Sequence, residues 1–115
     1  MTWTELGAQL NALNVPGTAP VFAHFGWSSA PAGDYGVYAE ERGRNILTGD
    51  NRNAERAVSG YVDWFTRTDA RAVPDAIEAK FKELQETNVL AWYLNTVQYE
   101  ADTHFLHYEW LVELG

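Results

Sequence analysis

The stretch that decides the fold runs from Phe105 to Leu114 and reads FLHYEWLVEL. Residues two apart on a β-strand share one face of a sheet, so the alternation predicts one long strand with two different faces. One face is wholly apolar, and the other still carries Phe105 and Leu111 among polar side chains. The second face therefore needs partial cover, which makes self-association an early hypothesis about this protein.

Length and composition limit the classes of protein to consider. The chain has 115 residues, of which 46% are apolar and 14% aromatic, so we expect one folded domain over residues 1–115. The absence of cysteine excludes disulfides, thiolate zinc sites and cysteine catalysis. No long apolar run or basic leader is recognisable, so we expect neither membrane insertion nor export.

The charge of the chain is unevenly distributed. The formal net charge is -8, yet every arginine lies between Arg42 and Arg71. Nucleic-acid binding depends on many phosphate contacts from Lys and Arg, so the acidic remainder predicts a weak or repulsive relation to DNA.

An amphipathic helix is predicted at the N-terminus. Thr2 and Glu5 have the spacing of a capping box, and an apolar stripe follows until Asn14 and Pro16 end the pattern. Gly7 lies inside this helix, where glycine is unfavourable, so we expect a close packing contact there.

The middle of the chain predicts three strands and a second helix. Residues 21–25 and 35–41 are expected to form a hairpin with a long loop, and residues 56–66 a third strand. Residues 42–53 have no periodicity and predict an extended loop. Pro74 suits the first turn of a helix with an apolar stripe at Ile77, Phe81 and Leu84, and Asn88 is expected to end it.

Two strands complete the predicted fold. Residues 90–100 and 103–114 are separated by a polar turn near Ala101 and Asp102, so they should pair antiparallel. The order of helix, three strands, helix and two strands predicts an α+β fold, in which a mostly antiparallel sheet has two helices packed on one face.

The opposite face of that sheet is the first candidate interface. Two short helices cover only one face, and burial of a large apolar side chain contributes about 1.5–3 kcal/mol. A protein partner is the expected cover, and the alternative is that long loops of the same chain fold over this face. The residues predicted to form this sheet-face interface are Phe65, Tyr93, Val97, Phe105 and Leu111, with Tyr99 beside them.

The arginine-rich loop is the second candidate interface. Its cations are the main ones available to a chain otherwise rich in carboxylates, so they suit contacts with acidic faces of neighbouring copies or of another partner. The alternative is a loop that is merely solvated. The residues in question are Arg42, Arg44, Asp50, Asn51, Arg52 and Arg56.

No catalytic or cofactor motif is recognisable. His104 and His107 are three apart, so on one strand they would point to opposite faces and could not share a metal ion. Glu109 and Glu113 would share a face but lie about 13 Å apart, too far for a glycosidase pair. No phosphate-binding glycine loop or nucleophile elbow is present. We therefore expect no catalysis, no cofactor and no metal.

Several short motifs, taken in order, resemble the tail terminator, or tail-completion, proteins of long-tailed bacteriophages. The similarity covers most of the chain and rests on the order and spacing of Val21-Phe22-Ala23-His24-Phe25-Gly26, Tyr35-Gly36-Val37-Tyr38, Gly49-Asp50-Asn51, Tyr61-Val62-Asp63-Trp64-Phe65-Thr66 and Tyr108-Glu109-Trp110. The resemblance implies a ring, commonly a hexamer, that caps the tail tube protein and joins it to the head connector protein. It also implies a place in the virion tail after assembly in the bacterial cytoplasm, no cofactor, and passage of packaged DNA without specific binding.

A second function class stays open. The net charge and small size are also those expected of an acidic binding module, such as a DNA-mimicking inhibitor of a host enzyme. Arginines concentrated in one segment argue against that reading. A small enzyme with a site assembled between subunits is a third reading, and it would need His104 or His107 for turnover.

Overall fold

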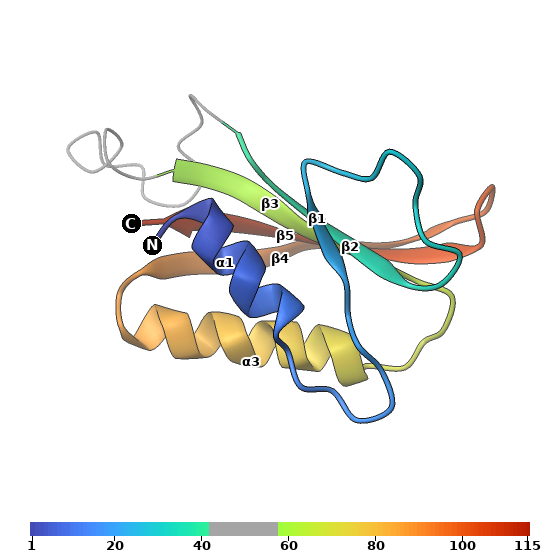
Figure 1. Ribbon diagram of the computed structural model, residues 1–115, viewed down its shortest axis with the longest axis horizontal. Helices are drawn as coiled ribbons and strands as arrows, with labels where there is room; N and C mark the ends of the chain where they lie inside the picture. Colours follow the sequence, from blue (N-terminus) through green and yellow to red (C-terminus); the bar gives the residue numbers. More distant parts are fainter. Residues whose placement is uncertain (42–57) are drawn as a thin grey trace.

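The computed structural model describes residues 1–41 and 58–115. The elements follow the predicted order and are α1 (Trp3–Asn11), β1 (Phe22–His24), β2 (Tyr35–Glu40), β3 (Val58–Thr66), α3 (Ala72–Glu86), β4 (Leu90–Glu100) and β5 (Phe105–Leu114). The predicted α+β class is therefore confirmed (Figure 1). The predicted loop and its candidate residues Arg42, Arg44, Asp50, Asn51, Arg52 and Arg56 lie outside the described residues.

The described strands form one five-stranded sheet in the order β1-β2-β3-β5-β4. The β2–β3, β3–β5 and β4–β5 pairs are antiparallel, which confirms the mostly antiparallel sheet and the predicted pairing of the last two strands. The predicted hairpin of β1 and β2 is wrong, because the two strands pair in parallel, with Phe22 opposite Gly36. Residues 25–34 return the chain to the start of the sheet before β2 begins, and Phe25 and Gly26 both have positive φ angles where this return starts.

Helix α1 begins with the predicted capping box. The hydroxyl of Thr2 accepts a hydrogen bond from the Glu5 backbone N–H, and the Glu5 carboxylate accepts one from Thr2. The close contact expected at Gly7 is also present, because a Cβ atom there would overlap the ring of Tyr38 in β2. Glycine thus lets α1 approach the sheet more closely than alanine would.

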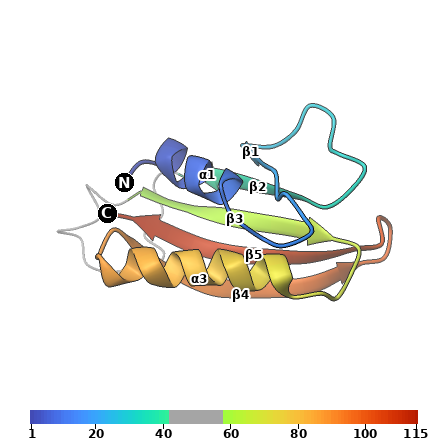
Figure 2. The ribbon, with the colours of Figure 1, turned by 60° about the horizontal axis from the view of Figure 1, so that its bottom comes forward.

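Helix α3 lies along the sheet beside β4 and β5 (Figure 2). Its buried residues include Ile77, Phe81 and Leu84, which is the predicted apolar stripe. Asn88 follows the helix with a φ angle of 61°, a left-handed conformation that asparagine tolerates well and that ends a helix.

The core lies between the helices and one face of the sheet. Side chains from α1, α3, β3 and β5 belong to the same buried cluster, so both helices cover the same face, as predicted. Trp64 and Trp110 are its largest fully buried residues. The apolar alternation of β5 supplies Tyr108, Trp110, Val112 and Leu114 to this cluster. We call the opposite face of the sheet, which points away from the helices, the second face.

Close packing of the sheet against α1 gives a first prediction at Gly60 in β3. A Cβ atom at Gly60 would overlap the backbone oxygen of Ala39 and crowd the indole of Trp3. Gly60→Ala should therefore lower the free energy of unfolding by about 1–3 kcal/mol, which urea denaturation measures. Gly33→Ala is the matched control, because nothing lies within 4 Å of its Cβ position. Equal stability of the two variants would contradict the packing described here.

Candidate interface and polar cluster on the sheet

Aromatic rings line up across three strands on the second face. Tyr35, Phe65 and His107 lie opposite one another on β2, β3 and β5. The Tyr35 and Phe65 rings stack with centroids 4.9 Å apart, and the Phe65 and His107 rings stack at 4.2 Å. This row shields much of the second face without any contribution from a helix.

The same row buries Phe105, one of the predicted interface residues. The Phe105 ring meets Tyr35 and Phe65 edge-on, and the guanidinium of Arg67 lies 4.6 Å above its centroid. Phe105 is consequently only 6% exposed. Leu111, on the same face, is 9% exposed. The expectation that both residues are left bare for a partner is therefore wrong, because both are buried within the chain, Phe105 by Tyr35, Phe65 and Arg67.

The predicted position of Val97 on the second face is also wrong, and the cause is a β-bulge in β4. The β4–β5 register shifts between Leu94 and Thr96, so Asn95 is an extra residue in β4. One extra residue reverses which side chains face the helices. Val97 and Tyr99 lie opposite Tyr108 and Leu106, on the helix side, whereas they were expected on the second face with Tyr93.

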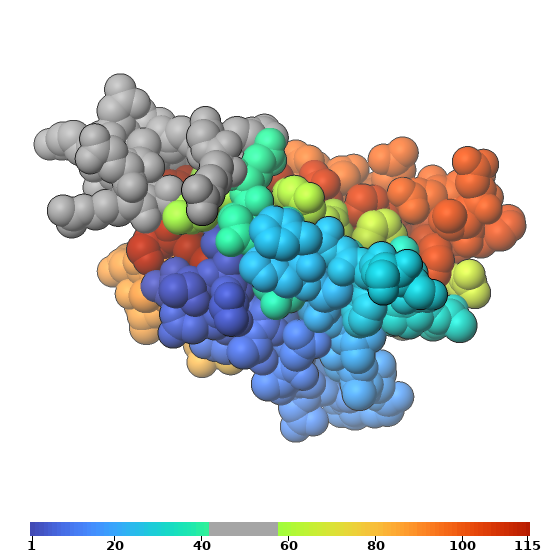
Figure 3. All heavy atoms as spheres, turned by 45° about the horizontal axis from the view of Figure 1, so that its top comes forward, coloured from blue at the N-terminus to red at the C-terminus, as the bar shows by residue number. Residues whose placement is uncertain are grey.

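The bulge leaves an apolar patch along the edge of the sheet. Leu94, Val97 and Tyr99 are 37%, 44% and 57% exposed, and we call them the β4 edge patch. The β4–β5 hairpin extends beyond the first turn of α3, so the helix does not cover its far end (Figure 1). The orange atoms of this hairpin form one end of the molecule in the space-filling view (Figure 3). Of the predicted sheet-face residues, Tyr93 is exposed and Phe65 is half-buried on the second face.

A polar cluster occupies the middle of the second face. The Nε2 atom of His107 lies 2.7 Å from Oδ1 of Asp63, in a hydrogen bond that the carboxylate accepts. One ligand-type atom from each of Asp63, His107 and Glu109 lies within 4.8 Å of the other two. The amide of Asn95 donates to Oε1 of Glu109 at 2.8 Å, and Oε2 of Glu100 lies 3.5 Å from Nδ1 of His107. The bulge thus directs Asn95 toward the cluster.

Burial and charge set the protonation of this cluster. Burial raises the pKa of the Asp63 carboxyl above its usual value, although the hydrogen bond and charge of His107 act in the opposite direction. Burial also disfavours the His107 cation, but its hydrogen bond with Asp63 and the nearby carboxylates outweigh this effect and raise the pKa of His107. Both shifts reflect a site where negative charge is concentrated away from water.

Sequence reasoning missed this cluster because it paired the wrong histidines. His104 is not in β5 but in the turn before it, with a φ angle of 61°, and its Nδ1 lies 2.9 Å from the Tyr99 hydroxyl. The informative spacing is that of His107 and Glu109, which are two apart and therefore share a face. Asp63 lies directly opposite Glu109 on β3.

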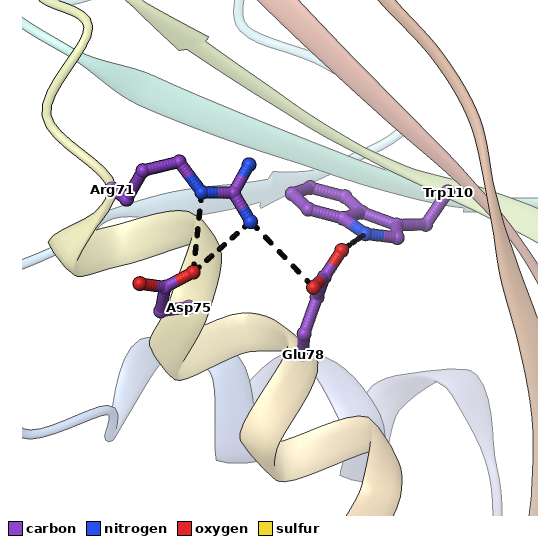
Figure 4. A network of polar contacts seen from close by, with 4 residues as sticks. All are labelled: Arg71, Asp75, Glu78 and Trp110. Atoms are coloured by element: carbon purple, nitrogen blue, oxygen red, sulfur yellow. Dashed lines mark hydrogen bonds and ion pairs between the residues drawn. The ribbon is translucent and has the colours of Figure 1, made fainter.

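A second polar network connects α3 to β5 of the sheet (Figure 4). The indole N–H of Trp110 donates to Glu78 at 2.9 Å, and Arg71 lies 3.7 Å from the other oxygen of Glu78. Arg71 also donates to Asp75 in the first turn of the helix. Since Trp110 is fully buried, Glu78 is the acceptor that satisfies its only polar atom.

Comparison with known proteins adds no family assignment. No protein-family model matches the chain, and no curated protein or solved structure matches it significantly. Neither of the described helices has the length and apolar character needed to cross a membrane.

The Trp110 contact gives a second prediction. Glu78→Ala should lower the free energy of unfolding by about 1–3 kcal/mol, because it leaves a buried indole N–H without an acceptor. Glu78→Gln should lower the free energy of unfolding by less, since its amide oxygen can still accept the hydrogen bond from Trp110. Glu86→Ala, at an exposed position of the same helix, should stay within about 0.5 kcal/mol of the wild type. A comparable loss in Glu86→Ala would show that helix charge, rather than the indole contact, is responsible.

Proposed function

We propose that this protein is a self-assembling structural subunit of the tail-terminator type, which forms a ring through the exposed edge of β4. The observation that carries the proposal is the combination of an edge strand of eleven residues with the apolar β4 edge patch. The α+β order of elements supports it as the order of the family that the sequence resembles.

The edge of β4 has little of the usual protection against pairing. Natural sheets shield exposed edges with lysine, proline, charged side chains or very short strands. β4 has no lysine, arginine or proline, and its single charged residue is Glu100 at the end of the strand. The bulge at Asn95 interrupts the edge only once. The strand at the other edge, β1, has three residues and is far less able to pair.

Another copy of the chain is the occupant that fits this edge best. In a ring, β4 of one copy must contact a different surface of the next copy, because β4 paired with β4 would close a two-fold dimer. A strand of eleven residues spans roughly 37 Å. That length is enough for one side of a standard protein interface, which buries about 800 Å² per partner. Main-chain hydrogen bonds along β4 would supply the contact, and burial of Leu94, Val97 and Tyr99 would supply the hydrophobic stabilisation.

The acidic groups of the chain argue against the alternative, a DNA-mimicking inhibitor. A mimic presents carboxylates to its target, whereas many carboxylates here bind residues of the same chain. Asp34 accepts a hydrogen bond from the Thr66 hydroxyl. Arg71 forms ion pairs with Asp75 and Glu78, and Lys80 forms one with Glu83. Asp63 and Glu109 of the second face lie in the polar cluster with His107.

In the proposed role, the ring caps the tail tube protein and presents its other side to the head connector protein. The acidic surface would let packaged DNA pass without specific binding. The location would be the virion tail, assembled in the cytoplasm of the bacterial host. No catalytic step and no cofactor belong to this role.

Assembly through β4 is tested by a charge placed in its patch. Val97→Lys should prevent the association that the proposal expects of the wild type at high concentration, because the lysine would be buried unpaired against a neighbour. Light scattering over a range of concentrations, followed by negative-stain imaging, reads out the oligomer. Val21→Lys is the matched control, since Val21 is 38% exposed but lies away from β4.

The proposal predicts rings for the wild type and Val21→Lys, and monomers for Val97→Lys. A wild type that stays monomeric at every concentration would contradict self-assembly through this edge. Capture of a host nuclease or polymerase subunit by that monomer would favour the acidic binding module instead. Rings that survive in Val97→Lys would place the interface elsewhere on the molecule.

A further inference from the structure

We propose that Asp63, His107 and Glu109 form a binding site for one divalent transition-metal ion, and that Zn²⁺ is the ion this ligand set suits. The inference goes beyond assembly and is independent of it. It departs from the sequence expectation of no metal, which considered His104 and His107 as the ligand pair.

The backbone brings the three side chains together. His107 and Glu109 are two apart on β5 and point to the same face, and Asp63 lies opposite Glu109 on the neighbouring strand. Their ligand atoms all lie within 4.8 Å of one another. Metal–ligand distances of about 2.1 Å place ligand atoms roughly 3.0–3.5 Å apart. To reach that spacing the side chains must rotate and the hydrogen bond between Asp63 and His107 must be lost.

Neighbouring side chains are arranged as the outer shell of a metal site. A histidine that binds a metal through one ring nitrogen usually directs its other nitrogen to a carboxylate or carbonyl. His107 points Nε2 toward Asp63 and has Glu100 3.5 Å from Nδ1. Asn95 donates to one oxygen of Glu109, which leaves the second oxygen for an ion. The Phe65 ring stacks on His107 and fixes its plane.

Electrostatics favours a cation at this position. Two carboxylates meet on the second face, and Asp63 is 5% exposed, so water screens their repulsion poorly. No lysine or arginine of the described residues forms an ion pair with Asp63 or Glu109. A divalent ion would neutralise both carboxylates and link β3 to β5.

The ligand set selects among metals. Magnesium and calcium prefer sites made of oxygen ligands alone, whereas an imidazole nitrogen favours zinc, iron, copper and nickel. One nitrogen and two carboxylate oxygens fill three positions of a zinc tetrahedron and leave the fourth for water. Binding requires neutral His107, so it should release protons and weaken as the pH falls.

Metal binding is tested on the purified, full-length chain after chelator treatment. Isothermal titration with Zn²⁺ measures stoichiometry and affinity, and Co²⁺ absorption reports the coordination geometry. The wild type should bind one ion per chain with a tetrahedral Co²⁺ spectrum. At a hundredfold excess over the dissociation constant, Zn²⁺ should raise Tm by about 10 °C.

Variants assign the site to its residues. Glu109→Gln and Asp63→Asn keep side-chain size and should weaken Zn²⁺ binding by more than a hundredfold. Asn95→Ala removes an outer-shell donor and should weaken binding by about 10–100-fold. His104→Gln and His24→Gln are the matched controls, because they change the other two histidines and should leave affinity unchanged. Circular dichroism confirms that each variant is folded.

Two outcomes would overturn the proposal. One is a wild type that shows no saturable binding of Zn²⁺ or Co²⁺. The other is binding that survives in Glu109→Gln but is lost in His104→Gln or His24→Gln, which would assign the metal to surface histidines. Neither readout depends on oligomerisation, so the result stands whether or not the protein forms rings.

Discussion

The pairing of β5 with β3 on one side and β4 on the other is the constraint on which the described structure depends. β5 pairs with both neighbours along nearly its whole length. Its helix-facing side chains, among them Trp110 and Val112, anchor the core beneath α1 and α3. Its opposite side chains, Phe105, His107 and Glu109, belong to the aromatic row and the polar cluster of the second face. A one-residue slip would exchange the two sets and destroy both layers.

Much of this arrangement could be predicted from local pattern. The period of two in β5 and the period of 3.6 in α3 both persist over ten residues or more, so burial on one face determines them. The capping box of α1 and the left-handed Asn88 depend on neighbouring residues alone. These features are local, which is why sequence reasoning found them.

The sequence-based predictions were wrong where contacts between residues distant in sequence determine the structure. Nothing in residues 25–34 distinguishes a hairpin loop from a return that makes β1 parallel to β2, because both fit the same turn-rich composition. The bulge at Asn95 is a single inserted residue, and it moved Val97 and Tyr99 to the helix side. Burial of Phe105 depends on Tyr35, Phe65 and Arg67, which come from β2 and from the end of β3, both far from Phe105 in sequence. The polar cluster of Asp63, His107 and Glu109 likewise depends on the β3–β5 register. Only the spacing of His107 and Glu109 can be recognised in the sequence.

These corrections change the physical argument for assembly. The second face is largely closed by its own aromatic and polar side chains, so it supplies less of the driving force than expected. Among the described residues, exposed apolar side chains lie along β4, where the bulge and the overhang past α3 expose Leu94, Val97 and Tyr99, and also beside β1, at Phe25 and Trp27. The proposed interface is therefore the β4 edge of the sheet rather than its second face. The closed face can then hold a polar cluster without competing with an interface.

Backbone hydrogen exchange in β4, measured in dilute and in concentrated protein, tests this account most directly. The outward amides of β4 should exchange rapidly in the dilute chain and become protected as copies associate, while α1 keeps the same exchange rate. Particles that form without any change in β4 exchange would contradict the account. So would strong protection of those outward amides in a dilute monomer, because another part of the chain would then already occupy the edge.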